Sequence, residues 1–162
     1  MLTGCSSPSI HQSPPRSLRT ANALPTALDP VFSFRKQSLF LHDRSLNLAT
    51  PNQMINFERE RIGYRAITEA EQAAREGHYF RFWWRTKRPA RVTVRLEYRQ
   101  AKLGAHVQAQ EVEVEAARRG TFQTNFEVIG DNYHKNGHVT AWRALIIENG
   151  KIVAQKQSFL WN

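Results

Sequence analysis

The clearest alternation of apolar and polar positions runs from Arg91 to Arg99, where every second residue is a valine, leucine or tyrosine. The following segment, His106 to Ala116, sets valines against glutamates in the same way. Successive side chains of a strand point to opposite faces, so each segment predicts a strand with one buried face. Gly104 between them predicts a turn, and the two strands are therefore expected to form a hairpin.

One register of this hairpin places apolar residues opposite apolar residues and arginines opposite glutamates. The predicted pairs are Val92 with Val114, Val94 with Val112, Arg91 with Glu115 and Arg95 with Glu111. We expect the two ion pairs on an exposed face, where each stabilises by about 0.2 to 1 kcal/mol. This pairing explains the arginines more simply than a nucleic-acid patch does.

The segment His78 to Arg88 interleaves large aromatic residues with cations more densely than any other part of the chain. As a strand, it would direct Phe80, Phe82, Trp84 and Thr86 to the core. The opposite face would be both aromatic and cationic. The candidate ligand-binding residues on that face are Tyr79, Arg81, Trp83 and Arg85.

The remaining segments predict shorter elements. Met54 to Ile67 is expected to form an irregular first strand, because Ile55 and Phe57 alternate with polar residues. Thr68 and Glu71 have the spacing of a capping box, which predicts a short helix from Ala70 to Glu76. Thr121 to Ile129 predicts another strand, and Gly130 to Gly137 a loop.

Asn149-Gly150 predicts a two-residue turn that joins the last two strands, Val139 to Ile147 and Ile152 to Trp161. This register would pair Arg143 with Lys156 and direct Phe159 to the core. It also leaves the outer face apolar, with Leu145, Ile147 and Ile152 among its residues. We expect the segment Val31 to Leu48 to cover that face; the alternative is a homo-oligomer interface through these three residues.

About seven short strands with one short helix predict an all-β fold, an antiparallel β-sandwich. Residues 52–162 resemble immunoglobulin-like and fibronectin type III-like domains in strand spacing and in the closing hairpin, with Trp84 in the place of the buried tryptophan. The resemblance implies adhesion or scaffolding and no catalytic residues. Residues 1–30, rich in serine and proline, are expected to be a disordered tether, and residues 31–51 a partly ordered segment that docks on the domain.

Leu2-Thr3-Gly4-Cys5 resembles the lipobox of bacterial lipoproteins, although only Met1 stands before it in this sequence. The resemblance implies lipidation of Cys5 and a location at the bacterial cell envelope; without lipidation we expect a cytoplasmic protein. Cys5 is the only cysteine, so no disulfide forms within the chain. No segment has the roughly 20 consecutive apolar residues of a membrane-spanning helix, so membrane contact is expected through Cys5 or surface charge.

A net charge of +9 favours anionic partners. Asp131, His134 and His138 are best interpreted as surface residues rather than a metal site, and no catalytic group or cofactor motif is recognised. The sequence therefore predicts a non-enzymatic module that binds a protein or cell-surface partner. Two alternatives remain: a carbohydrate-binding module that uses the face of Tyr79 and Trp83, and a binder of single-stranded nucleic acid, which is the least favoured.

Overall fold

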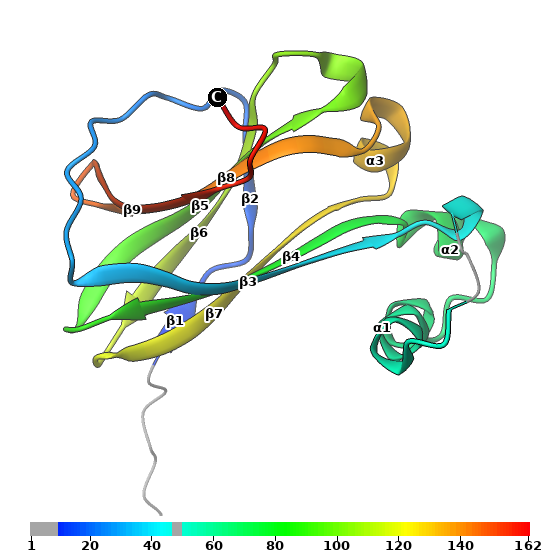
Figure 1. Cartoon of the computed structure of the whole chain (residues 1–162), viewed down its shortest axis with the longest axis horizontal. Coiled ribbons are helices and arrows are strands. Elements are labelled where there is room, and N and C mark those ends of the chain that lie inside the picture. The colour runs from blue at the N-terminus through cyan, green and yellow to red at the C-terminus, as the bar shows by residue number, and fades with distance from the viewer. Residues whose placement is uncertain (1–9, 47–49) are drawn as a thin grey trace, which may run out of the picture.

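The computed structural model describes residues 10–46 and 50–162, which form two facing antiparallel sheets with helices at one end (Figure 1). The strands are β1 (Ile10–Gln12), β2 (Arg16–Leu18), β3 (Phe32–His42), β4 (Gly77–Thr86), β5 (Ala90–Gln100), β6 (Gln108–Ala116), β7 (Gly120–Ile129), β8 (Val139–Glu148) and β9 (Lys151–Gln157). The helices are α1 (Gln53–Gly63), α2 (Glu69–Ala74) and α3 (Asp131–Asn136), with short 3-10 turns at Arg44–Leu46 and Ala101–Leu103. The predicted all-β sandwich is confirmed, with nine strands in the described part rather than seven.

The smaller sheet has the strand order β3-β4-β7, and the larger sheet the order β1-β6-β5-β8-β9, with β2 also paired to β6. Their inner faces contribute one core, in which Phe80, Phe82 and Trp84 of β4 are at most 1% exposed. Trp84 donates its indole N–H to the Thr124 hydroxyl at 2.9 Å, so the buried indole is satisfied. The predicted core face of the aromatic strand is therefore confirmed.

The predicted register of the β5–β6 hairpin is also confirmed, with Val94 opposite Val112 and Arg95 opposite Glu111. One expectation about it is wrong. Arg95 and Glu111 are buried, at 6% and 9% exposure, because the N-terminal segment crosses this face and its Asn22 carbonyl accepts a hydrogen bond from Arg95.

The β8–β9 hairpin has the expected turn, with Asn149 and Gly150 at φ values of 52° and 73°. Its pairing shifts between Ile146 and Ile147, so Arg143 lies opposite Gln157 and not opposite Lys156. Strand β9 also ends at Gln157, and Phe159 beyond it is 95% exposed rather than in the core. The alternating pattern could not reveal this irregularity, because one extra residue reverses the facing of all that follows.

Residues 10–30 lie against the larger sheet and are not the disordered tether expected over residues 1–30, of which residues 1–9 lie outside the described part. Strands β1 and β2 pair with β6, and the chain then reaches the other edge of the larger sheet, where Ala27 N–H donates to the Ile152 carbonyl at 2.8 Å. Backbone groups make these pairs, so they need no apolar side-chain pattern. Cys5 and the rest of the lipobox-like motif lie outside the described residues.

The outer apolar face of the last hairpin is covered by this N-terminal part, because Leu24 packs against Leu145, Ile147 and Ile152. The expectation that Val31 to Leu48 covers it is wrong for residues 31–46, the part of that segment that the structure describes. Most of that segment is β3, which belongs to the opposite sheet and pairs with β4.

Residues 53–63 form helix α1 and not the strand expected from Met54 to Ile67. Asn52 caps the helix, with its side-chain oxygen accepting hydrogen bonds from the amides of Met54 and Ile55. Glu58 to Arg61 are good helix formers, and Glu58 pairs with Arg61 one turn on. The cap and these propensities outweigh the alternation of Ile55 and Phe57.

Helix α2 carries the predicted capping box, in which the Thr68 hydroxyl accepts from the Glu71 amide at 3.1 Å and Glu71 accepts from Thr68 N–H. Residues 131–136, by contrast, form α3 where a loop was expected. Gly130 and Gly137 flank this helix with φ values of 63° and 85°, so these glycines bound a helix instead of marking a loop.

Candidate functional site

The four candidate residues all lie on the outer surface of the smaller sheet, since they alternate along β4 with buried residues. The neighbouring strands extend this surface: Lys36 and Gln123 lie opposite Trp83, and Asn125 lies opposite Arg81. We call this surface the open face. Its residues are Lys36, Ser38, Phe40, Tyr79, Arg81, Trp83, Arg85, Thr121, Gln123, Asn125 and Glu127.

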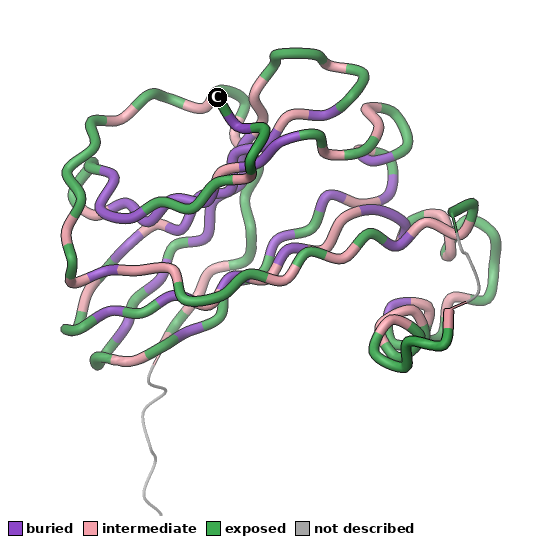
Figure 2. Tube along the Cα trace, viewed as in Figure 1, coloured by how far each residue is buried: buried purple, intermediate pink, exposed green. Residues whose placement is uncertain are grey.

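The two outer faces of the sandwich differ in how they are covered. The N-terminal part of the chain lies over the larger sheet, where it buries Arg95 and packs Leu24 on Leu145. On the smaller sheet, intermediate and exposed positions alternate with buried ones along β4 and β7 (Figure 2). The helices contact the open face through Glu58 of α1, which pairs with Arg81, and through Arg75 at the end of α2, whose carbonyl accepts from Tyr79.

Two of the candidate residues are committed to contacts within the chain. The Tyr79 hydroxyl donates to the Arg75 carbonyl at 2.6 Å, and burial raises the pKa of Tyr79 to about 12, so the phenol stays a neutral donor. Arg81 donates to Glu58 of α1 at 2.8 Å. Burial opposes ionisation of Glu58, but the hydrogen bonds from Arg61 and Arg81 prevail and lower the pKa of that carboxyl.

The other two candidates face solvent more freely. Trp83 is half-buried, and the Lys36 ammonium lies 5.0 Å from its ring centroid, which is a cation–π distance. Arg85 is exposed and makes no ion pair with any residue in the described part of the chain. The accessible part of the open face therefore includes Lys36, Trp83 and Arg85. The exposed polar residues of β7 lie beside them, namely Thr121, Gln123, Asn125 and Glu127.

Sequence reasoning missed Lys36, Gln123 and Asn125, because they come from strands far apart in the chain. The only sequence signal for the last two is the alternation of polar residues along Thr121 to Ile129. Lys36 carried no such signal, since a shift in register after Phe34 brings it opposite Trp83.

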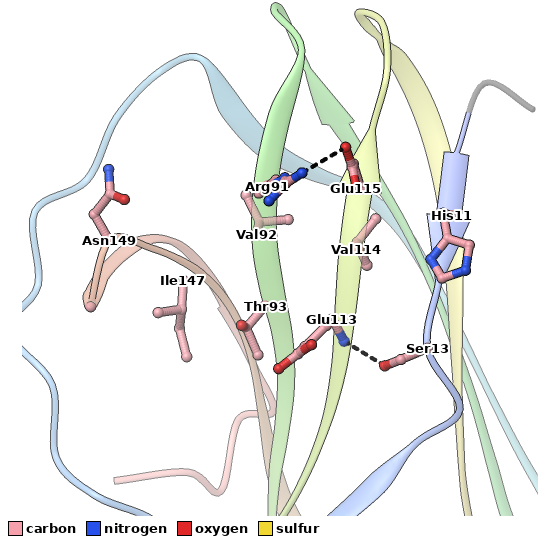
Figure 3. A pocket seen from close by; sticks show the side chains of 11 residues that line it. His11, Ser13, Arg91, Val92, Thr93, Glu113, Val114, Glu115, Ile147 and Asn149 are labelled. Carbon is pink, nitrogen blue, oxygen red and sulfur yellow. Dashed lines mark hydrogen bonds and ion pairs between the residues drawn. The ribbon is translucent and has the colours of Figure 1, made fainter.

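A separate hollow of about 330 Å³ lies on the outer face of the larger sheet, between β1 and the tip of the β8–β9 hairpin (Figure 3). Arg91 and Glu115 form an ion pair of 3.2 Å on its wall, and the Ser13 hydroxyl accepts from the Glu113 amide at 2.9 Å. His11 approaches from β1. These two contacts engage part of the polar groups that line this hollow.

An apolar opening of about 420 Å³ lies between the sheets, where β3 faces the C-terminal residues. Leu39 and Phe159 line its rim, and the His78 ring at its wall accepts a hydrogen bond from the Val139 amide at 2.9 Å. Burial, followed by the charge of His138, lowers the pKa of His78 to about 4. His78 is therefore a neutral structural acceptor at physiological pH.

The described residues contain no group of three or more His, Cys, Asp or Glu side chains placed to hold a metal ion. Of the three residues considered for a metal, His134 contacts the Ala73 carbonyl at 3.0 Å. Among the helices described, none is long and apolar enough to cross a membrane.

The fold and the open face define a β-rich protein of two antiparallel sheets, in which the outer surface of the smaller sheet is aromatic and cationic. Comparison with protein-family models, with curated proteins and with solved structures gave no match.

Proposed function

We propose that this protein is a non-enzymatic binding module of the immunoglobulin-like class, displayed at the bacterial cell envelope through lipidation of Cys5. Its open face binds a protein or another cell-surface partner. The observation that carries the proposal is the contrast between the two outer faces. One is partly covered by the N-terminal part of the chain, and the other presents Lys36, Trp83 and Arg85 to solvent.

The strand order supports the architecture. Strands β3 to β9 can be counted as the seven strands of a sandwich. The first, second and fifth of them (β3, β4 and β7) then form one sheet. The fourth, third, sixth and seventh (β6, β5, β8 and β9) form the other sheet, in that order. Fibronectin type III-like modules resemble this arrangement. In this comparison β1 and β2 are additions to the edge of the second sheet.

The chemistry of the open face supports binding. Tryptophan and arginine are enriched in the cores of protein interfaces, because each combines a large contact area with polar groups that fix orientation. Lys36, Arg81 and Arg85 outnumber Glu58 and Glu127 around this face, which favours an acidic partner.

Carbohydrate binding is the second candidate. It is favoured by the position of Trp83 beside the side-chain amides of Gln123 and Asn125, because sugars are held by ring stacking together with amide hydrogen bonds. Lys36 would have to move from the Trp83 ring for a sugar to stack on that side.

Titration of the isotopically labelled protein, followed by the indole N–H signals in NMR spectra, tests the binding site. A glutamate-rich peptide, neutral oligosaccharides and a single-stranded oligonucleotide are the three probes, and Trp83→Phe assigns the signal of Trp83. We expect the peptide to shift the Trp83 signal and to leave the buried Trp84 signal in place, and Arg85→Ala to weaken the shift. Oligosaccharide shifts alone would favour the second candidate. If no probe shifts Trp83, the open face is not the binding site.

The envelope location has its own test, mass spectrometry of the protein isolated from its host. A diacylglyceryl group on Cys5 is the expected result, and an unmodified Cys5 would refute the anchor without bearing on the open face.

A further inference from the structure

Two turns at one end of the sandwich carry a cluster of cations. Residues 87–89 join β4 to β5, and residues 117–119 join β6 to β7. The pairing of Thr86 with Gly120 brings the two turns together. We call this surface the basic end; its exposed cations without an ion pair to any described residue are Arg85, Lys87, Arg118 and Arg119.

The acidic residues near the basic end are already engaged. Glu148 binds Arg88 at 2.7 Å, and Glu115 binds Arg91 at 3.2 Å. Asp29 accepts a hydrogen bond from the Val31 amide at 2.9 Å and lies close enough to Arg88 to act on it electrostatically. The four cations therefore leave a local excess of positive charge, which attracts an anionic surface at close range.

The N-terminal part of the chain joins the fold at the same end. Ile10 pairs with Ala116, two residues before Arg118 (Figure 1). Cys5 precedes Ile10 by five residues, and a fully extended chain spans at most about 3.6 Å per residue. A lipid on Cys5 would therefore hold Ile10 within about 18 Å of the membrane surface.

This value is the limit for a fully extended chain, and any less extended path brings the two turns closer to the membrane. Charge interactions with the headgroups become effective within the screening length, which is about 8 Å at physiological ionic strength. None of the exposed large apolar side chains of the described residues lies in the two turns. The contact would be with headgroups and without insertion, so it should depend strongly on salt.

We propose that the basic end rests on an anionic lipid surface, with Lys87, Arg118 and Arg119 facing the headgroups and Arg85 at the edge that the basic end shares with the open face. This inference rests on the lipid anchor at Cys5 in the proposed function. It fixes the orientation of the module: the helical end points away from the membrane, and the open face stands at the side, accessible to a partner in the envelope.

The test uses the full chain with Cys5→Ser, which removes the anchor and isolates the charge contribution. Co-sedimentation with neutral phosphatidylcholine vesicles is compared with vesicles rich in phosphatidylglycerol, at 50 and 300 mM salt (about 14 and 6 Å screening length). We expect binding to the anionic vesicles alone, with loss at the higher salt. Each cation removed should weaken binding about five-fold, so Arg118→Gln with Arg119→Gln should cost about 25-fold.

A matched control removes the same charge from the opposite end through Lys102→Gln with Lys135→Gln, both exposed near α3. This control should bind almost as the parent does. Three outcomes would each overturn the proposal. They are equal losses of binding in the two double variants, binding to neutral vesicles, and a preference for a single-stranded oligonucleotide over anionic vesicles. Failure of the vesicle assay with a lipid present on Cys5 would refute the basic end alone, whereas an unmodified Cys5 would refute the anchor.

Discussion

Arg95 offers the sharpest test of how the N-terminal part stabilises the sandwich. It is 6% exposed and lies between two buried carboxylates, with Nη2 at 2.8 Å from Glu111 and Nη1 at 4.0 Å from Glu97. Its Nη1 also donates to the Asn22 carbonyl at 2.9 Å. Arg95→Met removes the charge and keeps an unbranched side chain, so the two carboxylates lose their shared partner.

The expected cost follows from what remains around each carboxylate. Removing one member of a buried ion pair costs about 3 to 5 kcal/mol, because the other charge stays desolvated. Glu111 keeps Arg16 and Glu97 keeps Arg143, so we expect a loss near the lower limit, about 3 kcal/mol. A double substitution of Arg95 and Glu111 should be non-additive by about 1 to 3 kcal/mol.

Arg91→Met is the matched control, since Arg91 pairs with Glu115 on the same two strands. The Arg91 side chain is 83% exposed, and its pair should contribute at most about 1 kcal/mol. Urea unfolding followed by tryptophan fluorescence gives both free energies. Losses that differ by less than about 1 kcal/mol would refute the reasoning, because they would mean that cover by the N-terminal part does not change the strength of the ion pair.

Three further predictions concern stability and use the same urea assay. Thr124→Val should cost about 1 to 3 kcal/mol, because it leaves the buried Trp84 indole without its acceptor; a loss within about 0.5 kcal/mol would contradict that role. The pKa of His78 is lowered to about 4 in the folded protein, so the unfolded chain binds a proton more readily than the folded protein does. Stability should therefore fall as the pH falls from about 6.5 towards 4. Between pH 7.5 and pH 5 the expected loss is about 2 kcal/mol. His78→Gln should remove that part of the pH dependence, and an unchanged profile would exclude His78 as its source. Gly77→Ala should cost about 3 kcal/mol or more, because Gly77 has a φ of +140° and a Cβ there would lie 2.2 Å from a carbonyl oxygen of β7. Gly63→Ala is the control: its Cβ would meet no atom within 4 Å, so stability should change by less than about 1 kcal/mol.

The sequence by itself determined the two faces of the regular strands. The alternation along β4 separated Phe80 and Phe82 from Trp83, and the matching of valines and charges was sufficient to select the β5–β6 register. Local chemistry also located the Asn149-Gly150 turn and the Thr68 capping box. These features depend on side chains close together in the chain or directly opposed in one hairpin, so the pattern alone specifies them.

The tertiary structure decided whatever depends on segments far apart in the chain. The N-terminal part joins the larger sheet through backbone groups, which leave no trace in side-chain periodicity, and its passage over Arg95 converts an expected surface ion pair into a buried one. The same holds for the candidate site. Periodicity placed Tyr79, Arg81, Trp83 and Arg85 on one face, but only the packing of β3, β7 and α1 beside β4 determines that Tyr79 and Arg81 are engaged within the chain while Trp83 and Arg85 remain accessible.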